Sequence, residues 1–168
     1  MKTYNIEIMT SISLFLPAII TNLMLNIFYE IKRKCNLLWL DYPLDLNLNL
    51  GKNRLLGDST TIGGFIVSII CGLGLSFVPF FQYTLTLSLL SYFGHALGSF
   101  IKRRLGIPRG NFLPIVDHGD YMILSSIYFV SLDVINYKYA LLCTILVMII
   151  QPVFAYLSWR LGIREDKI

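Results

Sequence analysis

The chain has 168 residues, of which 55% are hydrophobic and 14% are charged, and its mean hydropathy is +0.66. This composition excludes an ordinary soluble domain and indicates a single integral membrane domain over residues 1–168. The net charge of +4 is low for a nucleic-acid-binding protein. We therefore expect the partners to be the lipid bilayer and small ligands, with no nucleic acid.

Five apolar segments approach the length of about 20 residues that a helix needs to cross a bilayer. We predict an all-α, multi-pass bundle of about five transmembrane helices in the cell membrane. The second and third segments are expected to form an antiparallel hairpin, and the fourth is short enough to be tilted or partly interfacial. The segments cover residues 8–29, 62–81, 83–101, 121–135 and 139–157.

Basic residues orient the predicted bundle. Twelve of the 14 lysines and arginines lie in three places: between the first and second segments, between the third and fourth segments, and after the fifth segment. Only Lys2 and Lys138 lie on the opposite side of the predicted bundle. Basic residues concentrate on the cytoplasmic side of membrane proteins. This predicts an outside N-terminus, a cytoplasmic C-terminus and two cytoplasmic loops, at about residues 30–61 and 102–120.

Small and polar residues inside the apolar segments predict helix contacts. Gly94 and Gly98 lie one turn apart in the third segment, and four glycines lie between residues 63 and 74 of the second. Such faces let helix backbones approach closely. Asn22 and Asn26, one turn apart in the first segment, are expected to form hydrogen bonds between helices.

The stretch from residue 94 to residue 120 is the most informative part of the sequence. An apolar segment runs directly into a group of cations, and two closely spaced carboxylates follow. Cations complement phosphate oxygens, and carboxylates are the hard ligands that Mg²⁺ selects. A basic group after an apolar segment is also the ordinary signal of membrane orientation. The cations are Lys102, Arg103, Arg104 and Arg109, and the carboxylates are Asp117 and Asp120.

The first loop ends in a run that is typical of a helix start. Residues 57–61 read G-D-S-T-T, and Ser59, Thr60 or Thr61 could cap the free amides of the next helix. Free amides at a helix N-terminus beside small hydroxyl groups can also bind phosphate. Taken alone, this run is as consistent with a plain cap as with a binding site.

The two loops together resemble those of the CDP-archaeol synthases, relatives of bacterial phosphatidate cytidylyltransferases. In the first loop, P-L-D at residues 43–45 and R-L-L-G-D-S-T-T at residues 54–61 are similar to the family's P-x-D and R-x-L-G-D-G-K-T. In the second, S-F-I-K-R-R-L-G-I-P-R-G at residues 99–110 and D-H-G-D at residues 117–120 are similar to its S-F-x-K-R-R-L-G-I-x-R-G and D-Q-x-D.

This resemblance implies transfer of a cytidylyl group from CTP to a membrane lipid phosphate, such as an archaeal-type diether glycerol phosphate, with release of pyrophosphate. It implies Mg²⁺ as cofactor, held by Asp117 and Asp120, and these two carboxylates with Lys102 as catalytic residues. Substrate binding falls to the remaining motif residues, namely Asp58, Thr60, Thr61, Ser99, Arg103, Arg104 and Arg109.

Two positions depart from the family's pattern. Thr60 stands where the family has a lysine, and His95 stands where it has an acid. His95 is either a weak metal ligand, because Mg²⁺ prefers oxygen, or an ordinary buried, hydrogen-bonded histidine.

The departures leave open a catalytically impaired relative that binds nucleotide or lipid or acts as a scaffold. A small transporter or channel subunit is disfavoured, because His95 is nearly the sole ionisable group deep in an apolar segment. The sequence does not decide which lipid phosphate reacts or whether the chain forms a homodimer.

Overall fold

The computed structural model describes residues 8–35, 38–50, 53–56, 60–79, 81–107, 113–160 and 162. Over these residues the fold is an all-α bundle, as predicted, with only one short β-hairpin in a connection. The α-helices are α1 (Ile8–Lys34), α2 (Ile62–Leu75), α3 (Thr84–Arg104), α4 (Pro114–Ser131) and α5 (Tyr137–Arg160).

The connection between α1 and α2 contains the small elements. The 3₁₀ helix η1 (Leu38–Asp41) is followed by β1 (Asn49–Leu50) and β2 (Asn53–Arg54), which pair antiparallel. Just before α2, Thr61 pairs with Pro43 in an isolated antiparallel β-bridge, which brings the two ends of this part of the connection together.

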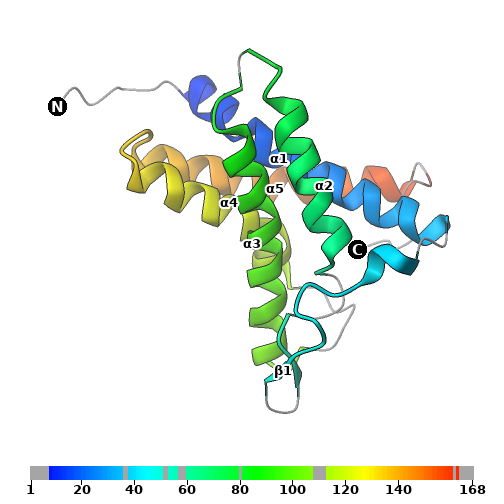
Figure 1. The fold of residues 1–168 in the computed structure, drawn as a ribbon. Coiled ribbons are helices and arrows are strands. Elements are labelled where there is room, and N and C mark those ends of the chain that lie inside the picture. Colours follow the sequence, from blue (N-terminus) through cyan, green and yellow to red (C-terminus); the bar gives the residue numbers. More distant parts are fainter. Residues whose placement is uncertain are drawn as a thin grey trace.

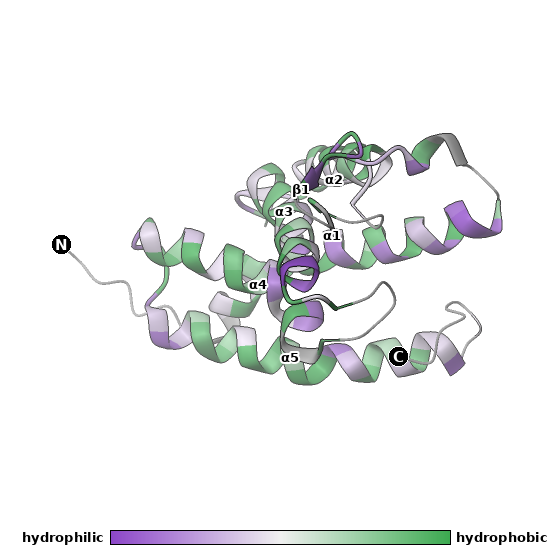
Figure 2. Ribbon diagram, turned by 90° about the horizontal axis from the view of Figure 1, so that it is seen from below, coloured by the Kyte–Doolittle hydropathy of each residue, from purple (hydrophilic) through white to green (hydrophobic). Residues whose placement is uncertain are grey.

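The helices form two groups that cross each other. Helices α1, α4 and α5 run alongside one another, and the hairpin of α2 and α3 runs across them (Figure 1). Figure 2, turned by 90°, shows α3 nearly end-on while α1 and α5 again extend across the view. As a result, α3 packs against α1, α2 and α4 and occupies the centre of the molecule.

The apolar core lies where α1, α3, α4 and α5 meet. Phe15 of α1 and Phe129 of α4 are fully buried and pack edge to face with ring centroids 5.3 Å apart. Aromatic pairs in this geometry add to the stabilisation that burial gives. The buried cluster consists of Phe15, Ala18, Leu87, Tyr121, Met122, Phe129, Ile135, Ala140 and Cys143.

The protein is a multi-pass membrane protein. Among the described residues, three helical stretches are long and apolar enough to cross a bilayer, namely Thr10–Lys34, Thr84–Arg104 and Tyr137–Arg160. Hydrophobic residues dominate α1, α4 and α5, whereas hydrophilic residues gather at the C-terminal end of α1 and where α3 meets α4 (Figure 2). Helix α2 is apolar but shorter.

Several helix ends differ from those predicted. Three helices extend into their polar flanks, and one ends early. Helices α1 and α3 each continue through three basic residues that were assigned to loops, and cations in a last turn interact favourably with the helix dipole. Helix α4 begins seven residues early, at Pro114, because proline suits the first turn of a helix. Helix α2 ends at Leu75, before Pro79, rather than at residue 81.

Candidate functional site

A close crossing of α3 and α4 builds the first half of the candidate site. A Cβ atom added at Gly94 would lie 2.5 Å from Tyr121 Cα, and one added at Gly98 would lie 2.8 Å from Asp120 Oδ2. The atoms close to Gly94 belong to the backbone of α4, so only glycine allows the two helices to approach this closely there. The predicted packing role of these glycines is confirmed, and it brings the carboxylates of α4 against α3.

Asp117 is engaged by groups on both of these helices. Lys102 Nζ donates to Asp117 Oδ1 and Oδ2 at 2.8 and 3.0 Å, and the amide of Leu113 donates to Oδ2 at 2.7 Å. Asp117 therefore satisfies an orphan amide at the start of α4 and fixes Lys102 near the end of α3. The structure thus brings together two of the three residues that were predicted to be catalytic.

Asp120 lies one turn further along α4 and faces His95 of α3. The distance from His95 Nδ1 to Asp120 Oδ2 is 3.7 Å, while Asp120 Oδ1 accepts a hydrogen bond from the amide of Tyr121. The Asp120 side chain is 8% exposed and that of His95 is 44% exposed. His95 is consequently not the ordinary buried histidine considered above, since it stands between Asp120 and an open space.

The donors in this cluster fit Mg²⁺. Asp120 offers carboxylate oxygens next to His95, and Mg²⁺ commonly binds through one or two carboxylates and completes its shell with water and substrate phosphates. Within the described residues no three His, Cys, Asp or Glu side chains group closely enough to hold a metal by themselves. A metal here would therefore need ligands from a bound substrate, and joint binding by Asp117 and Asp120 stays a prediction.

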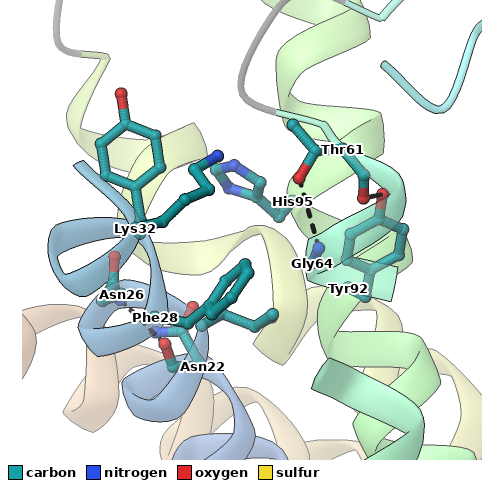
Figure 3. Close-up of a pocket in the computed structure, with 10 residues that line it drawn as sticks. Asn22, Asn26, Phe28, Lys32, Thr61, Gly64, Tyr92 and His95 are labelled. Carbon is teal, nitrogen blue, oxygen red and sulfur yellow. Dashed lines mark hydrogen bonds between the residues drawn. The ribbon is translucent and has the colours of Figure 1, made fainter. Parts of the chain in front are cut away.

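The second half of the candidate site is a cavity of about 200 Å³ between α1, α2 and α3. Figure 3 shows the side chain of Lys32 extending across it toward His95, with Thr61 and Tyr92 on the opposite wall and Asn22 and Asn26 below. The lining residues are Asn22, Leu25, Asn26, Phe28, Tyr29, Lys32, Thr61, Gly64, Tyr92 and His95.

The wall formed by the start of α2 is held by hydrogen bonds between side chains and the backbone. Thr61 is the N-cap of α2, where its hydroxyl accepts from the Gly64 amide at 3.2 Å, and its carbonyl accepts from the Tyr92 hydroxyl at 2.7 Å. The predicted cap is therefore confirmed. Thr60 is fully buried, and its hydroxyl has no hydrogen-bond partner among the described residues. Position 60 thus does not project into the cavity as Thr61 does.

The rest of the first loop is ordered by Asp45, which is 5% exposed. Its carboxylate accepts from the amides of Asn47 and Leu56 at 3.1 and 3.0 Å. The tip of the loop is held by Arg104, which donates to the carbonyl of Leu50 at 2.9 Å. The Arg104 hydrogen bond attaches the β1–β2 hairpin to the end of α3.

The other predicted site residues are distributed as follows. Arg103 donates to the carbonyl of Ile107 at the end of α3, and Ser99 is buried within that helix. Asp58 and Arg109 lie outside the described residues. The binding roles predicted for these four residues stay predictions.

Several residues that line the cavity were missed as site residues. Asn26 was expected to bond to another helix, but its side chain donates to the carbonyl of Asn22 at 2.9 Å in its own helix, and both residues face the cavity. Lys32 was interpreted only as part of an orientation signal. The sequence did hold one clue, since Phe28 and Tyr29 precede Lys32 by four and three residues and so share its side of the helix.

The chain is similar in sequence to known proteins. Residues 74–167 match the family model described as CarS-like CDP-archaeol synthase. The chain is 33% identical over 147 residues to a CDP-archaeol synthase of Saccharolobus islandicus (strain Y.N.15.51 / Yellowstone #2), covering 82% of each chain. It is 28% identical over 144 residues to one of Methanocaldococcus jannaschii, covering 73% of this chain and 81% of the relative.

The fold has a counterpart among solved structures. A structure described as an intramembrane enzyme for archaeal membrane lipid biosynthesis is similar with a TM-score of 0.64 and 24% identity. The similarity covers 88% of this chain and 93% of the other. At this identity the comparison supports the fold alone.

Proposed function

The chain belongs to the CDP-archaeol synthase family, and from this premise we propose that it transfers the cytidylyl group of CTP to an archaeal-type diether glycerol phosphate in the membrane. The observation that carries the proposal is the meeting of two features at His95. On one side lies the carboxylate cluster, formed by Asp117 and Asp120 of α4 against α3, and on the other lies a cavity with one buried cation, Lys32, in its wall.

The reaction needs positioning and charge neutralisation rather than covalent participation of the protein. An oxygen of the lipid phosphate attacks the α-phosphorus of CTP, a new P–O bond forms, and the bond to the bridging oxygen breaks to release pyrophosphate. The lipid phosphate is already ionised near neutral pH, so no strong general base is required.

Each part of the site has a task in this reaction. Asp120, together with substrate phosphates, would hold Mg²⁺, which supplies neutralisation of the charge on the triphosphate when bound. Lys102 remains near the carboxylates because Asp117 fixes it, and its ammonium can turn to a phosphate oxygen. Asp117 in turn maintains the start of α4, so that Asp120 keeps its place against α3.

The test is a direct assay of product. Protein purified in detergent is incubated with Mg²⁺, radiolabelled CTP and either diether glycerol phosphate or diacylglycerol phosphate, and CDP-lipid is separated by thin-layer chromatography. We expect labelled CDP-lipid with the diether substrate, and loss of product when Mg²⁺ is chelated. Product from the diacyl substrate alone would contradict the proposed lipid class.

A second candidate function rests on Thr60 and His95, which replace a lysine and an acid of the family's pattern. A catalytically impaired relative would bind CTP without turning it over. Equilibrium dialysis with labelled CTP distinguishes the two functions, because binding without CDP-lipid formation would favour the impaired relative.

A further inference from the structure

We propose that Lys32 is a phosphate-binding residue of the cavity between α1, α2 and α3, where its ammonium exchanges Asp41 for a phosphate oxygen of a substrate. The proposal deepens the proposed function, on which it rests, by assigning a cation to the cavity. The phosphate is that of the nucleotide or that of the lipid, and the experiment below separates these two sources.

The burial of Lys32 sets it apart from its neighbours. Its side chain is 4% exposed, whereas Arg33 and Lys34, the next residues of α1, are exposed. A lysine is rarely buried to this degree unless its charge is compensated. Among the described residues that line the cavity, Lys32 alone carries a permanent charge. The wall of this low-dielectric cavity therefore carries one positive charge, while its counter-ion Asp41 is not among the residues that line the cavity, and such a space favours a further anion.

The counter-ion of Lys32 is well suited to exchange. Lys32 forms an ion pair with Asp41, the last residue of η1, whose side chain is 45% exposed. Asp41 can be hydrated where it stands, so it loses little when the pair separates, whereas Lys32 cannot leave the protein interior. A substrate phosphate, which carries more negative charge than a carboxylate, can take the place of Asp41.

Aromatic rings keep the ammonium in position. Lys32 Nζ lies 5.1 Å from the centroid of the Tyr29 ring and 5.9 Å from that of Phe28. Ring faces attract a cation without accepting its N–H groups in the way that oxygen does. Lysine has three such donors, so donors remain for an anion.

The position of the cavity connects Lys32 with the carboxylate cluster. His95 lines the cavity and also stands 3.7 Å from Asp120. Lys32 extends toward His95 in Figure 3. A phosphate held by Lys32 would thus lie on the cavity side of His95, near the oxygen that Asp120 offers to a metal.

The experiment compares four variants with the wild-type protein in detergent. Lys32→Met removes the cation, Lys32→Arg keeps it, and Lys34→Met removes an exposed charge two residues away. Asp41→Asn removes the counter-ion and leaves Lys32 free. Two quantities are measured: the Kd of CTP by equilibrium dialysis with Mg²⁺, and the KM of diether glycerol phosphate at saturating CTP.

We expect Lys32→Met to raise the Kd of CTP or the KM of the lipid by about ten- to a hundredfold, since a charge-assisted hydrogen bond is lost. A change in the Kd of CTP assigns the site to the nucleotide, and a change in the KM alone assigns it to the lipid. Lys32→Arg should stay within a few-fold of wild type, and Lys34→Met should match it. Asp41→Asn should bind as tightly as wild type or more tightly, because a competing anion is gone.

Two results would overturn the proposal. One is a Lys32→Met variant whose two constants equal those of Lys34→Met. The other is an Asp41→Asn variant in which the Kd of CTP or the KM of the lipid is about ten- to a hundredfold higher than in wild type, which would mean that the ion pair serves folding only. The second result decides the matter even if Lys32→Met does not fold. If the wild-type protein forms no CDP-lipid, the proposed function fails, but the CTP measurements still test Lys32.

Discussion

The two halves of the candidate site are built on opposite principles. In the carboxylate cluster, Asp117 is paired with Lys102 and with the amide of Leu113, so its charge is compensated without any ligand. In the cavity, Lys32 has an exposed counter-ion and faces an open space. The contacts of Asp117 in the carboxylate cluster stabilise the fold, whereas the charge of Lys32 in the cavity is available to bind an anion. Substitutions should therefore separate stability from binding.

The largest effect should come from the helix crossing that supports both halves. Gly94→Ala would place a Cβ atom 2.5 Å from Tyr121 Cα, and backbone cannot yield as a flexible side chain does. We expect a loss of about 1–3 kcal/mol of stability through overpacking, and a loss of activity as Asp120 moves away from His95. Thermal unfolding in detergent and the CDP-lipid assay measure the two.

Gly74→Ala is the matched control for the crossing. Nothing lies within 4 Å of a Cβ atom added at Gly74, so this change should be neutral or stabilising, because alanine favours a helix. Equal losses in both variants would show that the close approach of α3 and α4 does not set the effect.

The two carboxylates of α4 should differ. Asp120→Asn should lower cytidylyl transfer by about a hundredfold with little change in unfolding temperature, because it removes a charge that acts on the substrates. Asp117→Asn should cost about 1 kcal/mol of stability, since it weakens a partly exposed ion pair and a helix cap. Rates and unfolding curves of both variants check the contrast, and identical behaviour would contradict it.

The positions that depart from the family pattern should respond unequally. His95→Asp places a second carboxylate opposite Asp120 and should tighten Mg²⁺ binding by about tenfold, because oxygen replaces imidazole. Thr60→Lys should not raise the transfer rate, because position 60 is fully buried and a long cation has no room there. Titration of Mg²⁺ in the CTP-binding assay tests the first, and a faster Thr60→Lys enzyme would count against the second.

The smallest effect should appear at the loop. Arg104→Ala removes the bond to the Leu50 carbonyl on an exposed surface, so stability should fall by less than about 1 kcal/mol. Limited proteolysis should nonetheless cleave the β1–β2 hairpin faster than in wild type. Arg33→Ala, which removes another exposed arginine, is the control and should leave the cleavage rate unchanged.

Hydropathy and residue spacing in the sequence were sufficient to predict the overall architecture. Apolar runs predicted the helices, and the spacing of Gly94 and Gly98 predicted the close contact that the structure contains. Thr61 was predicted as one of three alternative caps and is the cap observed. These features follow from local periods and from groups a few residues apart, which a sequence displays directly. The family also followed from local motifs, as the comparisons confirmed.

The tertiary structure alone decided how the charges are used. The sequence treats Asp117 and Asp120 as equivalent, yet one is bound to Lys102 and the other faces His95 because α4 crosses α3 at the glycines. Lys32 appears in the sequence as one of three consecutive basic residues, and its burial is seen only in the tertiary structure, where α1 packs against η1, α2 and α3. Burial and counter-ions depend on helices that are distant in the chain, and no local pattern encodes which of them meet.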